Sequence, residues 1–125
     1  MGIDIVAVAR IADMLDRHGP RFIRRCFHDV EIPSESLEME QTTGPDPAIL
    51  ASHWAAKEAF LKALGADVRP IPYRDIEVVT SLPGRGRLVL HGRALEALTL
   101  AGGNRIHLTL TQEGTLAMAS VLIEE

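Results

Sequence analysis

The residues of this chain best suited to chemistry are its lysines and two of its acidic residues. Only two of the thirteen basic residues are lysines, Lys57 and Lys62, and both lie with Glu58 in the segment 54–65. An ammonium on a flexible stem can reach a phosphate as a point charge. Alternatively, Glu58 and Lys62 form an ordinary i,i+4 pair that stabilises a helix by about 0.2–0.5 kcal/mol. Spacing alone favours this second interpretation.

The other acidic residue is Asp4, which interrupts the apolar segment GIDIVAV over residues 2–8. The β-branched composition is typical of a buried strand. A carboxylate there must be hydrogen-bonded, paired or bound to a cation, because burying it bare is costly. Before any resemblance is considered, a strand-end residue that accepts backbone hydrogen bonds is favoured over a metal ligand.

A long helix must position the lysines. Asp46 is a good N-cap, Pro47 suits a first helical turn, and Gly65 can end a helix in a left-handed conformation. Apolar residues at helical spacing are expected to face the core: Ile49, Leu50, Trp54, Ala55, Ala59, Phe60, Ala63 and Leu64. We therefore expect an amphipathic helix over 46–65, whose opposite sector carries His53, Lys57, Glu58, Leu61 and Lys62.

The remaining patterns predict an α+β fold with a mostly antiparallel sheet packed on this long helix. Short helices are expected over 10–17, 21–28 and 94–100, and strands over 75–80, 87–91, 105–111 and 116–123. In the strand 105–111, His107, Thr109 and Thr111 should share one face. That face is either exposed to solvent or lines a site.

Composition limits the class of protein. A chain of 125 residues with 46% hydrophobic content is expected to form a single domain over 1–125. We expect neither a membrane span nor a signal peptide, and hence a cytoplasmic protein. The net charge of −4 argues against nucleic acid as the main partner. Residues 10–25 nevertheless hold five arginines against two aspartates, which favours either docking of an acidic partner or neutralisation by the acidic stretch 29–46.

Six short motifs, in this order along the chain, resemble the holo-acyl-carrier-protein synthases, the small bacterial 4′-phosphopantetheinyl transferases. They are GIDIV at 2–6, Arg10-Ile11, Arg-Phe-x-x-Arg at 21–25, WAAKEAFLKALG at 54–65, DIEVV at 75–79 and HLTLT at 107–111. The resemblance implies a phosphopantetheinyl transferase-like fold. It also implies transfer of 4′-phosphopantetheine from coenzyme A to a serine of an apo acyl carrier protein, with release of 3′,5′-ADP. Mg²⁺ dependence, a homotrimer with sites between protomers, and a fatty-acid or polyketide pathway are further expectations.

The resemblance also assigns residues to roles. Asp4 and Glu58 match the metal ligands, and Lys62 matches the lysine near the pyrophosphate. Glu58 and Lys62 are the expected catalytic residues, with Glu58 or a metal-bound water accepting the serine proton. The expected coenzyme A ligands are Lys57, Lys62, Gly84, Arg85, His107 and Thr109. The expected carrier-protein contacts are Arg10, Met14, Arg21, Phe22 and Arg25.

Three positions differ from the family pattern. His53 stands where the family often has arginine, Gln112 where it has histidine, and Gly84-Arg85-Gly86 where it has a Gly-x-Pro turn. Glutamine can donate a hydrogen bond but carries no charge. The alternative to an enzyme is therefore a non-catalytic homologue that binds a carrier protein or coenzyme A.

Overall fold

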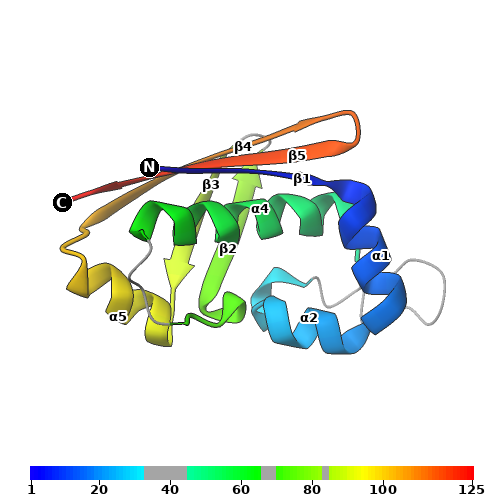
Figure 1. The fold of residues 1–125 in the computed structure, drawn as a ribbon, viewed down its shortest axis with the longest axis horizontal. Coiled ribbons are helices and arrows are strands. Elements are labelled where there is room, and N and C mark those ends of the chain that lie inside the picture. The colour runs from blue at the N-terminus through cyan, green and yellow to red at the C-terminus, as the bar shows by residue number, and fades with distance from the viewer. Residues whose placement is uncertain (33–44, 66–69, 83–84) are drawn as a thin grey trace.

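The structure is a computed structural model and describes residues 1–32, 45–65, 70–82 and 85–125. Its five-stranded sheet has the order β1-β5-β4-β3-β2, and every neighbouring pair is antiparallel. The long helix α4 packs against β1 and β5, and α1–α2 and α5 lie at opposite ends of the molecule (Figure 1). The predicted α+β fold, an antiparallel sheet on one long helix, is confirmed.

The described elements follow the predicted order, with small changes at their ends. They are β1 (Gly2–Ala7), α1 (Val8–His18), α2 (Pro20–Cys26), the 3-10 helix η1 (Asp29–Glu31), α4 (Pro47–Leu64), the 3-10 helix η2 (Tyr73–Asp75), β2 (Ile76–Leu82), β3 (Arg85–Leu90), α5 (Gly92–Leu100), β4 (Arg105–Glu113) and β5 (Leu116–Glu124). The acidic stretch falls mostly on residues 33–44, outside the described part of the chain. No helix in the described ranges is both long and apolar enough to cross a membrane.

The ends of α4 are those that the sequence predicts. The carboxylate of Asp46 accepts a hydrogen bond of 2.9 Å from the Ala48 amide, and Pro47 is the first helical residue. Gly65 follows the helix with φ of 97°, a conformation that L side chains rarely adopt.

The predicted amphipathic division of α4 is wrong in its details. Every residue from Leu50 to Lys57 is buried, including His53 and Lys57, which the periodicity places on the open side. Ile49, expected in the core, is 50% exposed. The reason is that α4 is covered on more than one side: β1 and β5 pack against it, as do α1 and β2.

The two faces of the sheet differ in what they contact. Toward α4, Val6 of β1 and Ala117, Ala119 and Val121 of β5 are buried. On the outer face, large apolar side chains remain between 38% and 54% exposed: Ile3, Ile5, Leu116, Met118 and Leu122. The register pairs His107 with Leu122 and Thr111 with Met118, so the predicted polar row of β4 lies on this outer face.

Candidate active site

Lys57 reaches into the interior of the molecule. Its side chain is fully buried, and its ammonium donates to Glu31 Oε1 at 2.7 Å, to the carbonyl of Tyr73 at 2.9 Å and to the carbonyl of Ile76. Burial lowers the pKa of Lys57, although the Glu31 carboxylate acts to raise it. All three ammonium protons have acceptors within the chain. Its position therefore gives no support to the expectation that Lys57 contacts coenzyme A.

Glu31 of η1 is the acid that holds this buried group together. Its Oε1 also accepts from the His28 amide at 2.9 Å, and its Oε2 lies 2.8 Å from Nδ1 of His53. Burial acts to raise the pKa of Glu31, but the His53 hydrogen bond and the Lys57 charge outweigh it, and the pKa is lowered. Glu31, His53 and Lys57 are called the buried cluster below.

Lys62 lies near the end of α4 and reaches toward β1. Its Nζ is 2.9 Å from Asp4 Oδ1 and 3.1 Å from the carbonyl oxygen of Ile3. The hydrogen bond and charge of Asp4 raise the pKa of Lys62. The salt bridge of Lys62 is thus made across to the strand, not along the helix to Glu58 as the spacing favoured. Asp4 is likewise paired with a side chain rather than with strand backbone.

A close approach of β1 to α4 makes this pairing possible. Gly2 lies against the helix, and a Cβ at this position would overlap the carbonyl oxygen of Ala59 and lie 2.7 Å from the Ala63 amide nitrogen. Asp4 and Val6 follow Gly2 on the same face of the strand. Glycine at position 2 therefore sets how near Asp4 comes to the turns of α4 that carry Glu58 and Lys62.

Tyr73 of η2 completes the group around Glu58. Its hydroxyl donates to Glu58 Oε1 at 2.7 Å. Burial, and then the Glu58 carboxylate, raise the pKa of Tyr73, so the phenol stays protonated and keeps donating. Tyr73 was not predicted as a site residue, because it lies between the predicted helix 46–65 and the predicted strand 75–80, where no periodic pattern marks it; its one signal is that it is the only tyrosine of the chain. Asp4, Glu58, Lys62 and Tyr73 are called the open cluster below.

The open cluster offers ligands for a hard divalent cation. Asp4 and Glu58 both act electrostatically on Lys62 and Tyr73, which places the two carboxylates in one neighbourhood. Lys62 engages Oδ1 of Asp4, and Tyr73 engages Oε1 of Glu58. Mg²⁺ usually takes one or two protein carboxylates together with phosphate oxygens and waters. The two carboxylates fit Mg²⁺. The Lys62 ammonium beside Asp4 shows that this place already accommodates a positive charge.

The other expected coenzyme ligands do not join the open cluster within one chain. His107 and Thr109 lie on the outer face of the sheet, whereas Asp4 faces α4. His107 Nε2 is 3.2 Å from Glu124 Oε1, and both side chains are about half exposed. Gly84 falls outside the described residues, and Arg85 is described only by its backbone at the start of β3.

The arginine-rich surface on α1 and α2 is present, with one correction. Arg10, Arg21 and Arg25 are exposed, and Met14 is half-buried. Phe22 is only 3% exposed and packs in the core, with its ring centroid 5.5 Å from that of Phe27 and 5.9 Å from that of Trp54. Its apolar ring is therefore part of the fold rather than of the surface that a carrier protein could contact.

Two departures from the family pattern have partners within the chain. The His53 ring is hydrogen-bonded to Glu31 in the buried cluster. The Gln112 amide donates to the carbonyl of Ala48 at 2.6 Å and to the hydroxyl of Ser52 at 3.0 Å. It thereby ties β4 to the first turns of α4, on the face of the sheet opposite His107. Both residues are accounted for by packing.

Comparison with known proteins points to one family. Residues 1–114 match the model of the 4′-phosphopantetheinyl transferase superfamily. A holo-[acyl-carrier-protein] synthase of Treponema denticola is 42% identical over 124 residues, which cover 99% of this chain and 96% of that protein. The crystal structure of the synthase from Neisseria meningitidis matches with a TM-score of 0.81 at 27% identity, covering 99% and 96% of the two chains. The synthase of Bacillus anthracis in complex with CoA (3′,5′-ADP) matches with a TM-score of 0.70 at 26% identity, covering 98% and 92%.

Proposed function

Because the chain belongs to the 4′-phosphopantetheinyl transferase superfamily, we infer that it is a holo-[acyl-carrier-protein] synthase. It transfers 4′-phosphopantetheine from coenzyme A to a serine of an apo acyl carrier protein and releases 3′,5′-ADP. The observation that carries this function is the near-full-length match to such synthases. The open cluster adds a chemical reason, because it gathers two carboxylates and an ammonium where α4 meets β1.

Asp4 and Glu58 are proposed as the ligands of a catalytic Mg²⁺. When bound, this ion would neutralise charge on the pyrophosphate of coenzyme A as the phosphoryl bond breaks. The Lys62 ammonium, released from Asp4, would then hold the departing 3′,5′-ADP oxygens as a point charge. Its 54% exposed side chain leaves it room to turn from the strand toward a substrate.

Glu58, or a water bound to the metal ion, is proposed as the proton acceptor for the serine hydroxyl. The serine oxygen forms a bond to the phosphorus that carries pantetheine, and the bond from that phosphorus to 3′,5′-ADP breaks. Tyr73 occupies Oε1 of Glu58 and so fixes the orientation of the carboxylate. The other oxygen can take the proton, because a carboxylate has two acceptor oxygens.

A homotrimer with its sites between protomers accounts for the placement of the remaining ligands. One chain presents the open cluster on the α4 side of its sheet and His107 and Thr109 on the outer side. A single site can use both sets only if neighbouring copies supply them. Ile3, Ile5, Leu116 and Met118 form an exposed apolar surface on the outer face that a second copy would cover. The count of three rests on the family resemblance.

The carrier protein is proposed to dock on Arg10, Arg21 and Arg25, in a cytoplasmic fatty-acid or polyketide pathway. These side chains are exposed on α1 and α2, and α1 packs against both α2 and α4. Charge reversal by Arg10→Glu and Arg21→Glu should raise the KM for the carrier protein and leave that for coenzyme A unchanged. Arg93→Glu on α5 is the matched control, since it alters an exposed arginine outside this surface. Unchanged carrier binding in the double variant would disprove the docking surface.

The transferase reaction is tested by the intact mass of an apo acyl carrier protein incubated with coenzyme A, Mg²⁺ and this protein. A gain of one phosphopantetheinyl group that requires both metal and protein is expected. Glu58→Gln should abolish the gain, whereas Glu96→Gln, an exposed glutamate on α5, should not. Binding of carrier protein or coenzyme A without any mass gain would establish the non-catalytic alternative. The contacts of His53 and Gln112 give that alternative no support.

A further inference from the structure

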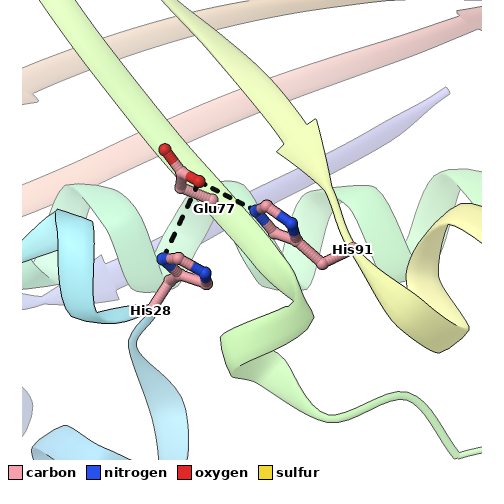
Figure 2. Close-up of side chains that lie close together, drawn as sticks. All are labelled: His28, Glu77 and His91. Atoms are coloured by element: carbon pink, nitrogen blue, oxygen red, sulfur yellow. Dashed lines mark hydrogen bonds and ion pairs between the residues drawn. The ribbon is translucent and has the colours of Figure 1, made fainter.

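A second group of potential metal ligands lies outside the open cluster. His28 precedes η1, Glu77 is on β2, and His91 lies between β3 and α5. One ligand atom from each residue lies within 4.8 Å of the other two. Figure 2 shows both imidazoles turned toward the Glu77 carboxylate, whose Oε1 is 2.8 Å from His91 Nε2 and 3.8 Å from His28 Nδ1. Three segments remote in sequence thus converge on one oxygen atom.

The two imidazole rings are held face to face at this point. Their centroids are 4.4 Å apart and their planes differ by 12°. Stacking of this kind fixes both rings beside Glu77 before any ligand arrives. An ion bound by both nitrogens would need at least one ring to turn out of this parallel stack, because the lone pair of an imidazole nitrogen lies in the plane of its ring.

A cation would displace two hydrogen bonds of this group. The Glu77 carboxylate accepts from His91 Nε2 at 2.8 Å, so His91 Nε2 carries a proton that it would give up to a metal ion. The Val30 amide donates to His28 Nδ1 at 3.3 Å, so this nitrogen presents a lone pair. It therefore donates no proton to the Glu77 oxygen 3.8 Å away. Glu77 is only 7% exposed, and a buried carboxylate needs compensation. A cation bound to Nδ1 would replace one long amide contact and stabilise the Glu77 charge.

We propose that His28, Glu77 and His91 form a binding site for a divalent transition metal, with Zn²⁺ as the best-matched ion. Two imidazole nitrogens and one carboxylate oxygen are a ligand set typical of zinc, whereas Mg²⁺ prefers oxygen ligands alone. The side chains of His28 and His91 are 27% and 38% exposed, so a fourth position is open to water. This site is distinct from the Mg²⁺ ligands Asp4 and Glu58.

Metal binding here would stabilise the fold. The His28 amide donates to Glu31, which belongs to the buried cluster, and Glu77 acts electrostatically on Lys57. An ion that ties His28 to β2 and to the start of α5 would therefore hold η1 against α4. Because a ligand that binds only the folded state raises its stability, Zn²⁺ should raise the Tm.

The test is calorimetric titration of the full chain, freed of metal with EDTA and then of EDTA, with Zn²⁺. One ion per chain and a raised Tm are expected with Zn²⁺, and Mg²⁺ added beforehand should not reduce Zn²⁺ binding, because Mg²⁺ prefers oxygen ligands alone. Glu77→Gln keeps an acceptor for His91 but removes the charged ligand, and should weaken Zn²⁺ binding by at least about tenfold. His18→Asn is the matched control, because His18 is an exposed histidine of α1. Glu58→Gln should also bind Zn²⁺ normally.

Imidazole NMR of the unaltered protein provides a second test that does not depend on a variant folding. Zn²⁺ should shift the ring nitrogens of His28 and His91 and leave those of His18 and His107 in place. Absence of stoichiometric binding, or shifts confined to other histidines, would overturn the proposal. Equal Zn²⁺ affinity in Glu77→Gln and in the unaltered protein would overturn it as well.

Discussion

The only two lysines of the chain lie five residues apart on α4, and each bonds to an acid. Lys57 and Glu31 are both fully buried, with a separation of 2.7 Å. Lys62 and Asp4 are 2.9 Å apart, with side chains 54% and 16% exposed. The two pairs resemble each other in length and chemistry, but the first is enclosed by protein and the second can exchange its partner.

This difference separates a structural role from a chemical one. A buried pair is held by the cost of leaving either charge without its partner. An exposed pair contributes little to stability, because water and salt screen it. Lys62 can therefore leave Asp4 when a cation and a phosphate arrive, whereas Lys57 has no such freedom.

Substitution of Lys57 is expected to have the largest effect. Lys57→Met keeps the length of the side chain but leaves Glu31 buried without its cation, so the free energy of unfolding should fall by about 3–5 kcal/mol. Urea unfolding measures the change. Adding Glu31→Gln should recover part of it, because the uncompensated charge is gone. A loss below about 1 kcal/mol in Lys57→Met would remove the contrast between the two pairs.

Lys62→Met is the complementary change. Transferase activity should fall by about 100-fold, because a cationic group near the leaving 3′,5′-ADP is lost. The free energy of unfolding should change little, as for most surface substitutions. Initial rates with saturating coenzyme A, measured beside urea unfolding, separate the two effects. Equal loss of stability in Lys57→Met and Lys62→Met would contradict the assigned roles.

Tyr73 belongs to the open cluster and also contacts Lys57 of the buried cluster, and these two contacts can be separated. Its carbonyl accepts from Lys57, whereas its hydroxyl donates to Glu58. Tyr73→Phe removes only the hydroxyl, so activity should fall by about tenfold while stability falls by about 1 kcal/mol. The pH profile of kcat should also change, because the orienting hydrogen bond to Glu58 is missing. An unchanged profile with reduced stability would mean that Tyr73 only fills space.

Much of the fold could be predicted from the sequence because its signals are local. Asp46, Pro47 and Gly65 mark the ends of α4 by their own backbone preferences. The alternation in β4 gives the two faces of the strand directly. The burial of His53 and Lys57 could not be predicted in this way, since it depends on β2 packing against α4 and on Glu31 of η1 bonding to a side of α4 that periodicity assigns to solvent.

The residues of the candidate site divide in the same way, into those that a sequence motif predicts and those whose contacts depend on the tertiary structure. Asp4, Glu58 and Lys62 were predicted through the resemblance, and the structure brings Lys62 to Asp4. Tyr73 could not be found by pattern, because its contact with Glu58 joins η2 to α4, two elements whose contacting residues are fifteen positions apart. Phe22 matched a motif by type, but its burial is a tertiary property that motif spacing does not contain.

The smallest difference between the two pairs is expected in acid. The pKa of Glu31 in the folded chain lies below its ordinary value of 4.5, so ionisation of this carboxyl favours the folded state. Its contribution to stability is present above about pH 4.5 and is lost as the pH falls through the lower folded value. The difference in unfolding free energy between the unaltered protein and Glu31→Gln should therefore shrink below about pH 4.5. For Lys62 the folded pKa is raised by its pairing with Asp4, so its own charge is lost only in alkali. Because water screens this exposed pair, the difference between the unaltered protein and Lys62→Met should change less in acid than the Glu31→Gln difference does. Urea unfolding of the three proteins between about pH 7 and about pH 3 measures both differences. A Glu31→Gln difference that does not change with pH would show that Glu31 is not held ionised by the buried cluster.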